Sequence, residues 1–426
     1  MIHLNGQPSE YASNGVYHNG ALARGAVTKR FRIACLSTHP IQYHAPLFRI
    51  LAKHPALDPM VYFLTSLDGG FDPGFGVRVK WDVPLLEGYP HEFIPCLGRQ
   101  SGLTFWRPWT YGLSRRLRAG RYEALLIHGY AHRALLWAIV AARMAGIHVL
   151  LRGDSQLAAE PRDKLRLAVK RKLLPKLFAF ISSFPASGTL NREYYLRYGV
   201  PAERIFPMPF AVDNAYFRDG AERASHSREQ LRAELGLEKS RPVILYASKL
   251  QAHKRPGDLI EAYAELASRF AGRPHAYLLF VGDGEQRRAL EMRAGEVARE
   301  SIRFLGFRNQ SELPALFDLA DVFVLTSEFE PWGLIVNEVM NAGRPVIVSD
   351  RVGAAPDLIE EGVNGFTYPV GDVAALADRI GRVLTDPATT DAMGRASQKK
   401  IADFSFEKNA DMLVVALDEL RSRNRR

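Results

Sequence analysis

Short apolar runs rich in Val, Ile, Leu and Phe alternate with longer stretches of helical periodicity along nearly the whole chain from Arg32 onward. This alternation constrains the fold more than any other feature, because it is typical of βα units wound around a parallel sheet. In the first half, the runs that we expect to form strands are residues 33–37, 60–65, 92–96, 124–129, 148–153 and 179–184. Helical patterns fit between most of them.

The alternation pauses at residues 205–217, where prolines and a polar turn indicate a crossover between domains. A second series follows, with expected strands at residues 243–248, 277–282, 302–305, 321–326 and 346–350. The sequence therefore predicts an α/β protein with two doubly wound parallel-sheet, Rossmann-like domains, whose ligands bind beyond the carboxyl ends of the strands. The expected division is a flexible leader at 1–28, an N-terminal domain at 29–210, a C-terminal domain at 211–400, and a C-terminal helix with a basic tail at 401–426.

The composition, with 47% hydrophobic and 24% charged residues, is that of an ordinary globular protein. The net charge of +10 suits nucleic acid, anionic membranes or phosphorylated small molecules as partners. Cys35 and Cys96 lack the spacing of a zinc or redox motif and are interpreted as buried thiols in a reducing cytoplasm. The N-terminal stretch lacks a signal-peptide pattern, and the apolar run at 134–151 is interpreted as a helix, a turn and a buried strand rather than a membrane span.

Two lysines follow the first strand of the second series. Lys249 and Lys254 lie in SKLQAHKRP, just ahead of a helix whose first position should be Pro256. Two cations at this position suit a diphosphate, although ordinary solvated lysines would give the same pattern. After the next strand, GDGEQRRALE lacks the third glycine of a dinucleotide fingerprint. It is interpreted as a plain strand-to-helix turn, with Glu285 in the first turn of the helix.

The stretch SEFEPWGLIVNE at residues 327–338 carries the strongest signal in the chain, because it places Glu330 in a loop and Glu338 in the helix that follows. The start of that helix has free N–H groups and the positive end of the helix dipole, so Gly333 and Leu334 can hold a phosphate. The two glutamates would accept hydrogen bonds from sugar or ribose hydroxyls. Together with the cationic loop, these features describe a site for a nucleoside diphosphate sugar.

Residues 243 to about 385 resemble the donor domain of glycosyltransferase family 4. The segments FVGDGEQR, RFLGF, LPALFDLADVFVLTSEFEPWGLIVNEVMNAGRPVIVSD and IEEGVNGF follow SKL…K in the order and spacing of that family. The resemblance implies the GT-B architecture, in which two domains face each other across a cleft. It also implies that Glu330 contacts the donor sugar, Glu338 the ribose hydroxyls, and Lys249 and Lys254 the phosphates. The family commonly has an arginine where Lys249 stands, and a lysine supplies the charge without the bidentate fork.

The first half resembles the family less, because the usual glycine-rich loop after the first strand is replaced by STHPIQYH. His39, Gln42 and His44 of this segment either line the cleft on the acceptor side or cap a loop. His128 ends the strand ALLIHG, where the family often carries a histidine close to the reacting sugar; the alternative is a histidine bonded to a backbone carbonyl. Arg152 and Asp154 in LLRGDS also end a strand, and they either face the acceptor side or form an internal salt bridge.

The sequence contains no Asp-x-Asp pair and no His or Cys cluster with the spacing of metal ligands. We therefore expect no metal and no cofactor, with the helix end and the lysines stabilising the departing diphosphate. The family resemblance implies a retaining reaction with front-face attack, in which the leaving phosphate helps to take the acceptor proton.

Positive charge is concentrated in the first half. Residues 99–121 contain six arginines and no acid, interleaved with aromatic residues, and residues 162–176 contain seven basic residues and one acid. The aromatic residues of the first segment are Phe105, Trp106, Trp109 and Tyr111. The apolar residues that recur at helical spacing opposite the lysines of the second segment are Leu165, Val169, Leu173 and Leu177. This pattern is typical of a helix on anionic lipid, although a solvated basic face is the plainer alternative.

These observations predict a cytoplasmic glycosyltransferase, peripheral at the inner membrane face. It would move a sugar from a nucleoside diphosphate sugar to a lipid-linked or glycan acceptor in bacterial polysaccharide or glycolipid assembly. Nucleic acid is not an expected partner, because the basic segments come without any nucleic-acid-binding motif. A GT-B sugar-nucleotide epimerase and a non-catalytic sugar-nucleotide-binding protein are the alternatives.

Overall fold

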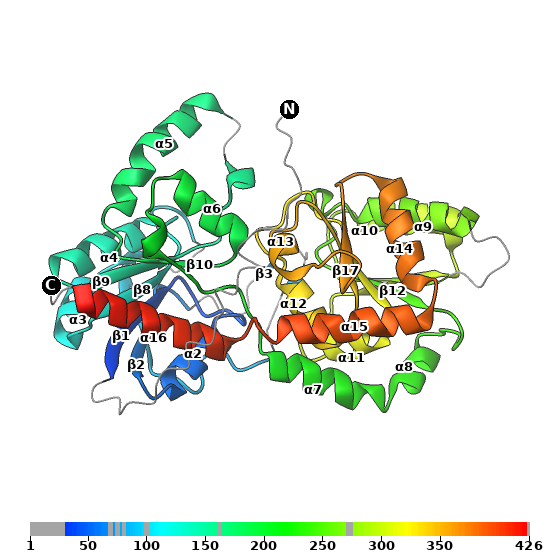
Figure 1. The fold of residues 1–426 in the computed structure, drawn as a ribbon, viewed down its shortest axis with the longest axis horizontal. Coiled ribbons are helices and arrows are strands. Elements are labelled where there is room, and N and C mark those ends of the chain that lie inside the picture. The colour runs from blue at the N-terminus through cyan, green and yellow to red at the C-terminus, as the bar shows by residue number, and fades with distance from the viewer. Residues whose placement is uncertain are drawn as a thin grey trace. The chain divides into compact units, whose positions relative to one another are not determined.

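The computed structural model describes residues 30–66, 71–72, 77–78, 82–97, 103–160, 163–269 and 276–423. The expected leader at 1–28 lies outside this range. The chain folds into two compact units, whose helices and strands are labelled in Figure 1. Unit 1 comprises Met1–Leu67, Pro84–Phe210 and Phe406–Arg426, and unit 2 comprises Asp68–Val83 and Ala211–Ser405.

Unit 1 is built on a parallel sheet with the strand order β5-β2-β1-β8-β9. These strands are β1 (Phe31–Ser37), β2 (Leu57–Phe63), β5 (His91–Phe93), β8 (Ala124–His128) and β9 (His148–Arg152). The central strands are almost wholly buried, as expected where helices cover both faces of a parallel sheet. The strand order reverses between β1 and β8, so the carboxyl ends of these two strands mark the switch point where such sheets bind ligands.

Helices connect and flank the strands of this sheet. They are α2 (Ala45–Lys53), α3 (Leu113–Gly120), α4 (Arg133–Met144), α5 (Lys164–Phe178), α6 (Thr189–Arg197) and the short turns η1 (Leu157–Ala159) and η2 (Ala202–Arg204). Next to β9, β10 (Phe184–Ala186) pairs in parallel with β11 (Ile205–Pro207). Two more strands, β6 (Cys96–Leu97) and β7 (Trp109–Thr110), form an antiparallel pair. Figure 1 shows α5 projecting from the rest of unit 1.

The last helix of the described chain, α16 (Phe406–Arg423), returns to unit 1 and packs against α2 and β11. The buried Asn409 side chain donates to the Pro209 carbonyl at 2.9 Å. Near the end of the helix, Arg421 forms an ion pair with Glu123 at 2.8 Å and lies over the Phe31 ring. The predicted helix at 406–420 is therefore confirmed, and its docking partner is the sheet-and-helix body of unit 1.

Unit 2 is built on a second parallel sheet, with the order β14-β13-β12-β15-β16-β17. Its strands are β12 (Val243–Ala247), β13 (Tyr277–Val281), β14 (Ile302–Gly306), β15 (Val322–Leu325), β16 (Val346–Ser349) and β17 (Gly365–Tyr368). Numbered from β12, this is the 3-2-1-4-5-6 order of dinucleotide-binding folds. The switch point of unit 2 therefore lies between β12 and β15.

The helices of unit 2 follow its strands, as the βα pattern requires. They are α7 (Asn214–Ser225), α8 (Arg228–Glu234), α9 (Pro256–Arg269), α10 (Arg287–Ala298), α11 (Leu313–Leu319), α12 (Leu334–Asn341), α13 (Ala355–Leu358), α14 (Val373–Leu384), α15 (Pro387–Ile401) and the turn η3 (Ala252–Lys254). A short antiparallel pair, β3 (Phe71–Asp72) and β4 (Val77–Arg78), completes the described strands. The strands β12, β13, β15 and β16 are buried and contribute to the core together with α9 and α14.

The structure confirms two parallel sheets flanked by helices, and it corrects some expected bounds. The strand expected at 179–184 is wrong, because α5 continues to Phe178 and the strand begins only at Phe184. Phe178 and Ile181 are buried, so the apolar run belongs to a helix end and a turn in the core. The strand expected at 92–96 is interrupted, with β5 ending at Phe93. The edge strand β17 was not predicted, since only four residues between glycine-rich turns form it.

Candidate functional site

The switch point of unit 2 brings together the loop after β12 and the loop after β15. Lys254 ends the short turn η3 in the first loop, and its amino group forms an ion pair with the carboxylate of Glu330 in the second. Only 12% of the Lys254 side chain and 17% of the Glu330 side chain are exposed, so the pair is largely shielded from water. Two residues that are separated by 76 positions in the sequence thus form one charged centre.

Hydrogen bonds to two backbone carbonyls fix the two loops against each other. The Thr326 hydroxyl donates to the Lys254 carbonyl at 2.7 Å, and the Glu328 N–H donates to the His253 carbonyl at 2.8 Å. Pro256 then begins α9, as predicted. The lysine is therefore held by a loop that has little freedom to move away from β15.

The loop after β16 holds Glu330 from the other side. The Glu330 N–H donates to the Arg351 carbonyl at 3.3 Å, and the Gly353 N–H donates to the Glu330 carbonyl at 2.9 Å. Glu330 and Val352 also pair as an isolated parallel bridge. Sequence reasoning missed these positioning contacts, because nothing in the sequence around residues 351–353 marks them.

Helix α12 begins beside the ion pair. Gly333 precedes its first residue, Leu334, with a φ of +93°, a conformation that favours glycine. A Cβ at this position would lie 3.3 Å from the Cγ of Glu330 and 3.2 Å from Val352 Cγ1. The start of the helix and Glu330 are therefore in close contact, and the N-terminal end of α12 adds its partial positive charge to that of Lys254.

The other predicted donor residues lie around this centre. Glu338 is on α12 and is only 1% exposed. On the same helix, Asn337 accepts a 2.7 Å hydrogen bond from the Trp332 indole, which fixes the tryptophan of the loop. Lys249 is half-buried at the start of the loop after β12, where the Gln251 N–H donates to its carbonyl.

The GDG turn after β13 supports the lysine loop by close backbone packing. A Cβ at Gly282 would lie 2.0 Å from the Ser248 carbonyl oxygen, and one at Gly284 would lie 2.5 Å from that of Leu250. The interpretation as a strand-to-helix turn is confirmed, and the glycines are needed because the two loops touch. The placement of Glu285 was wrong: α10 begins at Arg287, and Glu285 accepts from the Ala252 N–H instead.

In unit 1, the switch point brings His44 and His128 together. His128 ends β8, and its ring centroid lies 4.3 Å from that of His44, the residue that precedes α2. The Nδ1 atom of His44 lies 3.3 Å from the Ser37 hydroxyl at the end of β1. Burial lowers the pKa of His128 to about 3 and the pKa of His44 well below its usual value, with Arg152 lowering both further. Both imidazoles are therefore neutral at pH 7.

Arg152, at the end of β9, is 3% exposed and donates from Nη2 to the carbonyls of Met208 and Pro209, each at 3.2 Å. It also lies over the Phe210 ring. In the described part of the chain it forms no ion pair with Asp154, whose side chain is exposed, so the salt bridge that was the alternative interpretation is absent. His39 faces Thr38, with its Nδ1 3.0 Å from the hydroxyl, and burial lowers its pKa.

Unit 1 also exposes apolar side chains beside basic ones. On α4, Trp137, Val140 and Met144 lie on one face and are exposed. On α5, the exposed residues are Leu165, Val169 and Leu173, whereas Leu177 packs against the core. The exposed aromatic residues around β7 are Phe105, Trp106, Trp109 and Tyr111.

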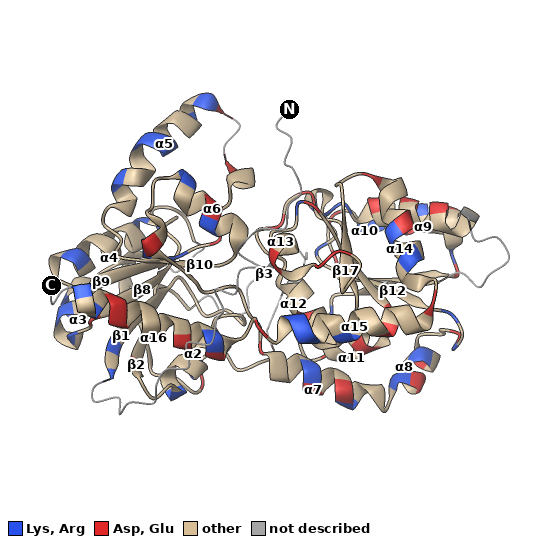
Figure 2. Ribbon diagram, in the orientation of Figure 1, with Lys and Arg blue, Asp and Glu red and all other residues tan. Residues whose placement is uncertain are grey.

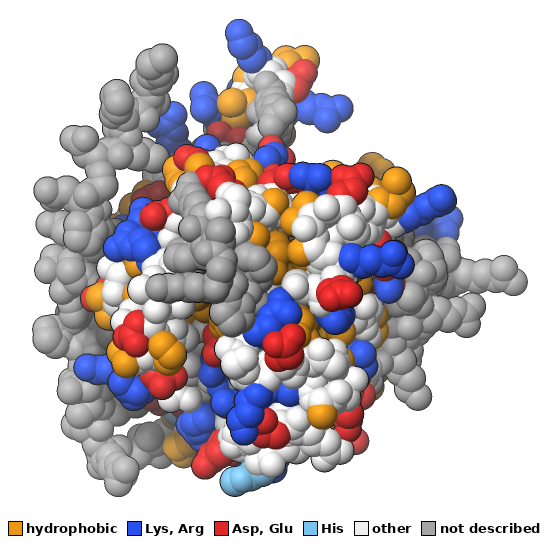
Figure 3. Space-filling view, turned by 90° about the vertical axis from the view of Figure 1, so that its right-hand side faces the viewer, with side chains coloured by type: hydrophobic (Ala, Val, Ile, Leu, Met, Phe, Trp, Pro, Cys, Tyr) orange, Lys and Arg blue, Asp and Glu red, His pale blue; other side chains and the backbone are white. Residues whose placement is uncertain are grey.

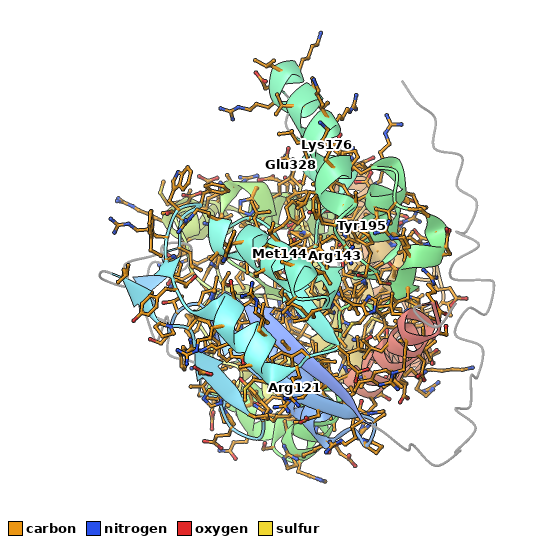
Figure 4. The ribbon with its side chains drawn as sticks, turned by 90° about the vertical axis from the view of Figure 1, so that its left-hand side faces the viewer. Arg121, Arg143, Met144, Lys176, Tyr195 and Glu328 are labelled. Carbon is orange, nitrogen blue, oxygen red and sulfur yellow. The ribbon has the colours of Figure 1, made fainter. Side chains whose placement is uncertain are left out.

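Figure 2 shows basic residues along the length of α5, and Figure 4 shows Arg143, Met144 and Lys176 at the ends of α4 and α5. Arg99 and Arg162, the first residues of the two basic segments, lie outside the described residues.

Unit 2 presents a different surface. Its large apolar side chains that are exposed are Met292 and Val363, as far as the structure describes the chain. Figure 3 shows acidic and basic side chains interspersed on its outer face. Across the described helices, none is long and apolar enough to cross a membrane. Nor do three or more His, Cys, Asp or Glu side chains of the described ranges gather where they could hold a metal ion.

The two strand orders, with switch-point sites on both sheets, define the GT-B class of fold, and solved structures share it. The crystal structure of Anabaena Alr3699/HepE in complex with UDP and glucose matches with a TM-score of 0.67 and 19% identity, over 92% of this chain and 100% of that chain. Residues 227–400 match the model of the family "Glycosyl transferases group 1". The match to this family model lies in the part of the chain whose motifs resemble a donor domain.

Two curated relatives each match half of the chain. Alpha-D-kanosaminyltransferase from Streptomyces kanamyceticus is 32% identical over 217 residues, which are 50% of this chain and 54% of that protein. D-inositol 3-phosphate glycosyltransferase from Corynebacterium urealyticum is 32% identical over 216 residues, 50% of each protein. The chain therefore matches about half the length of these relatives.

Proposed function

We propose that the chain is a glycosyltransferase that takes its sugar from a nucleoside diphosphate sugar bound to unit 2. The observation that carries this proposal is the shielded Lys254–Glu330 pair at the start of α12. Lys254, Lys249 and the N–H groups of Gly333 and Leu334 would hold the diphosphate. Glu330 would accept from the donor sugar and Glu338 from the ribose. The fold neighbour in complex with UDP and glucose supports this choice of ligand.

The reaction that we propose retains the anomeric configuration and needs no metal. The bond from the anomeric carbon to the diphosphate oxygen breaks while the acceptor oxygen bonds to the same face of that carbon. The acceptor proton passes to the leaving phosphate, whose charge Lys254 and the helix end stabilise. By the family resemblance, His128 acts close to the reacting sugar, and being neutral at pH 7 it can donate a hydrogen bond without adding charge.

A transfer assay with UDP-, GDP- and ADP-sugars and a bacterial lipid extract, analysed by mass spectrometry with and without EDTA, tests both proposals. We expect transfer from one donor class, unchanged by EDTA, and about a hundredfold or more slower in Glu330→Gln. Glu328→Gln, which removes an exposed carboxylate two residues away, is the matched control and should stay near the wild-type rate. Turnover that EDTA abolishes would contradict the metal-free reaction. Conversion of the donor without an acceptor would indicate an epimerase, and donor binding without turnover a sugar-nucleotide-binding protein.

We further propose a lipid-linked acceptor in bacterial polysaccharide or glycolipid assembly, with unit 1 resting on the anionic inner face of the cytoplasmic membrane. The support is the exposed apolar stripe on α5, Leu165, Val169 and Leu173, among basic residues. Apolar contact and attraction to anionic lipid act together on such a helix. Trp106 and Trp109 add aromatic side chains of the kind that favour the lipid–water interface.

Flotation with vesicles tests this surface. The wild-type protein should float with vesicles that contain phosphatidylglycerol and much less with pure phosphatidylcholine, and added salt should weaken the binding. Leu165→Ser combined with Leu173→Ser should reduce flotation, whereas Met292→Ser, an equally exposed apolar side chain on unit 2, should not. Equal binding of all three proteins would contradict the proposal.

A further inference from the structure

The switch point of unit 1 gathers nitrogen groups that have no acidic partner among the described residues. We propose that His44, His128 and Arg152 form a binding site for an oxyanion, a phosphate or a carboxylate, that the acceptor carries. This inference rests on the proposed function and deepens it, because it assigns a chemical class to the acceptor. His128 and Arg152 end β8 and β9, and His44 precedes α2 after the loop that follows β1, at the edge where a doubly wound sheet binds its ligand.

The first observation is the unsatisfied hydrogen-bonding capacity of His128. Both of its ring nitrogens are buried, and neither forms a hydrogen bond of normal geometry with the protein, although the nearby Leu36 backbone partly offsets the lowering of its pKa. A buried polar atom without a partner costs about 1 to 3 kcal/mol. A ligand oxygen that accepts from the imidazole N–H would remove that cost.

The second observation is the uncompensated charge of Arg152. Its Nε–H is buried and has no acceptor, and within the described ranges no carboxylate forms an ion pair with it. Burial lowers its pKa to about 10, so the guanidinium still carries a full charge at pH 7. A buried cation without an anion is unfavourable, and buried charges in proteins are usually paired. The backbone carbonyls of Met208 and Pro209 orient the group but bring no negative charge.

The third observation is that the one charged group beside the neutral His44 is the cation Arg152, which lowers the pKa of His44. Among the described residues, no acidic group opposes this effect. The positive end of the α2 dipole lies at the same place, since His44 directly precedes that helix. A neutral sugar hydroxyl would leave this potential uncompensated, whereas an oxyanion would accept from the imidazoles and the guanidinium at once.

The donor is not the source of this anion, because unit 2 has its own lysines and helix end for the diphosphate. The group must therefore belong to the acceptor or to a fragment of it. Inorganic phosphate and acetate are suitable probes for the phosphate and carboxylate classes. The full-length protein should be saturated with UDP first, so that added phosphate cannot act at the donor site.

The experiment follows the imidazole resonances of selectively ¹⁵N-histidine-labelled protein during titration with each probe at constant ionic strength. His44→Gln and His128→Gln assign the two signals. We expect phosphate or acetate to shift both and to raise the pKa of His128, and Arg152→Met to weaken this binding about ten- to a hundredfold. Arg152→Lys, which keeps the charge if the methionine variant does not fold, should weaken it less. Arg143→Met removes an exposed arginine from the same unit and should leave it unchanged.

The outcomes separate this inference from the proposed function. If UDP binds and sugar is transferred but neither probe moves the two signals, the oxyanion site is wrong and the donor site stands. Shifts confined to other histidines, or equal in Arg152→Met and wild type, would also overturn it. If the signals respond while no sugar nucleotide binds, the result supports the oxyanion site and contradicts the proposed function.

Discussion

The two units place charged side chains at equivalent points of two parallel sheets but neutralise them differently. In unit 2, Lys254 meets Glu330, and the charges cancel within the protein. In unit 1, Arg152 donates to two backbone carbonyls, and its ionisable neighbours are His44, His128 and Tyr195. The strand order determines where each site lies, whereas the local balance of charge determines what it can bind.

This difference gives the two sites different tasks. By the proposed function, a diphosphate that enters unit 2 draws Lys254 away from Glu330, which frees the carboxylate to accept from sugar hydroxyls. Lys254 then exchanges one anionic partner for another and is paired at both stages. A ligand of unit 1 instead supplies a charge that is missing, so the free protein bears the cost of an unpaired cation until the ligand arrives.

The largest expected effect comes from disturbing the scaffold of the unit 2 site. Gly282→Ala should destabilise the protein by about 2 to 4 kcal/mol, because its φ is +122° and the new methyl group would lie 2.0 Å from the Ser248 carbonyl. The same strain should displace the lysine loop and weaken UDP binding. Urea denaturation and calorimetric titration measure the two effects.

Gly236→Ala is the matched control for this substitution. Gly236 also has a positive φ, of +63°, but its Cβ would meet nothing within 4 Å. We expect a loss of about 1 kcal/mol in stability, from the backbone conformation alone, and unchanged UDP binding. If the two alanine variants were equally stable, close packing between the GDG turn and the lysine loop would play no part.

A smaller effect should come from breaking the charge pair itself. Lys254→Met and Glu330→Gln should each lower the free energy of unfolding by about 1 to 3 kcal/mol, because each leaves a largely buried charge without its counterpart. The double variant should cost less than the sum of the two, by about 1 kcal/mol or more, since no unpaired charge remains. The four stabilities, measured by urea denaturation, give this coupling energy.

The equivalent cycle in unit 1 should show no coupling. Arg152 and Asp154 are two residues apart, but Asp154 is exposed and forms no ion pair with the arginine in the described structure. The effects of Arg152→Met and Asp154→Asn should therefore add within about 0.5 kcal/mol. A coupling as large as that of Lys254 and Glu330 would mean that the two units neutralise their charges in the same way.

The sequence predicted where the sites lie better than how their residues pair. Lys254, Glu330 and His128 were predicted as site residues because each lies at or after the end of a strand, and the position of a strand end follows from the βα pattern. That Lys254 contacts Glu330, or that Arg152 contacts carbonyls 56 and 57 residues away, depends on strand order and loop geometry. These contacts leave no local signal in the sequence. The end of α5 was misplaced for a related reason, since a buried helix end and a buried strand have the same apolar composition.

The smallest effect concerns the protonation of His128, which unit 1 holds neutral. Burial lowers its native pKa to about 3, whereas the unfolded chain has the ordinary value of 6.5. Between these values the unfolded state binds more protons, so the free energy of unfolding must fall as the pH falls below 6.5. His128→Gln removes this contribution. From pH 7.5 to pH 5.5, the free energy of unfolding of this variant should therefore fall by about 1 kcal/mol less than that of the wild type.

Urea denaturation at these two pH values measures the difference, and His226→Gln, which removes an exposed histidine from unit 2, is the control and should follow the wild type. A bound oxyanion would reduce the wild-type loss, because it raises the native pKa of His128 toward that of the unfolded chain. Phosphate should therefore flatten the pH dependence of the wild type and leave that of His128→Gln nearly unchanged. Parallel pH profiles for the wild type and His128→Gln, with and without phosphate, would mean that the uncompensated charge of unit 1 does not act on His128.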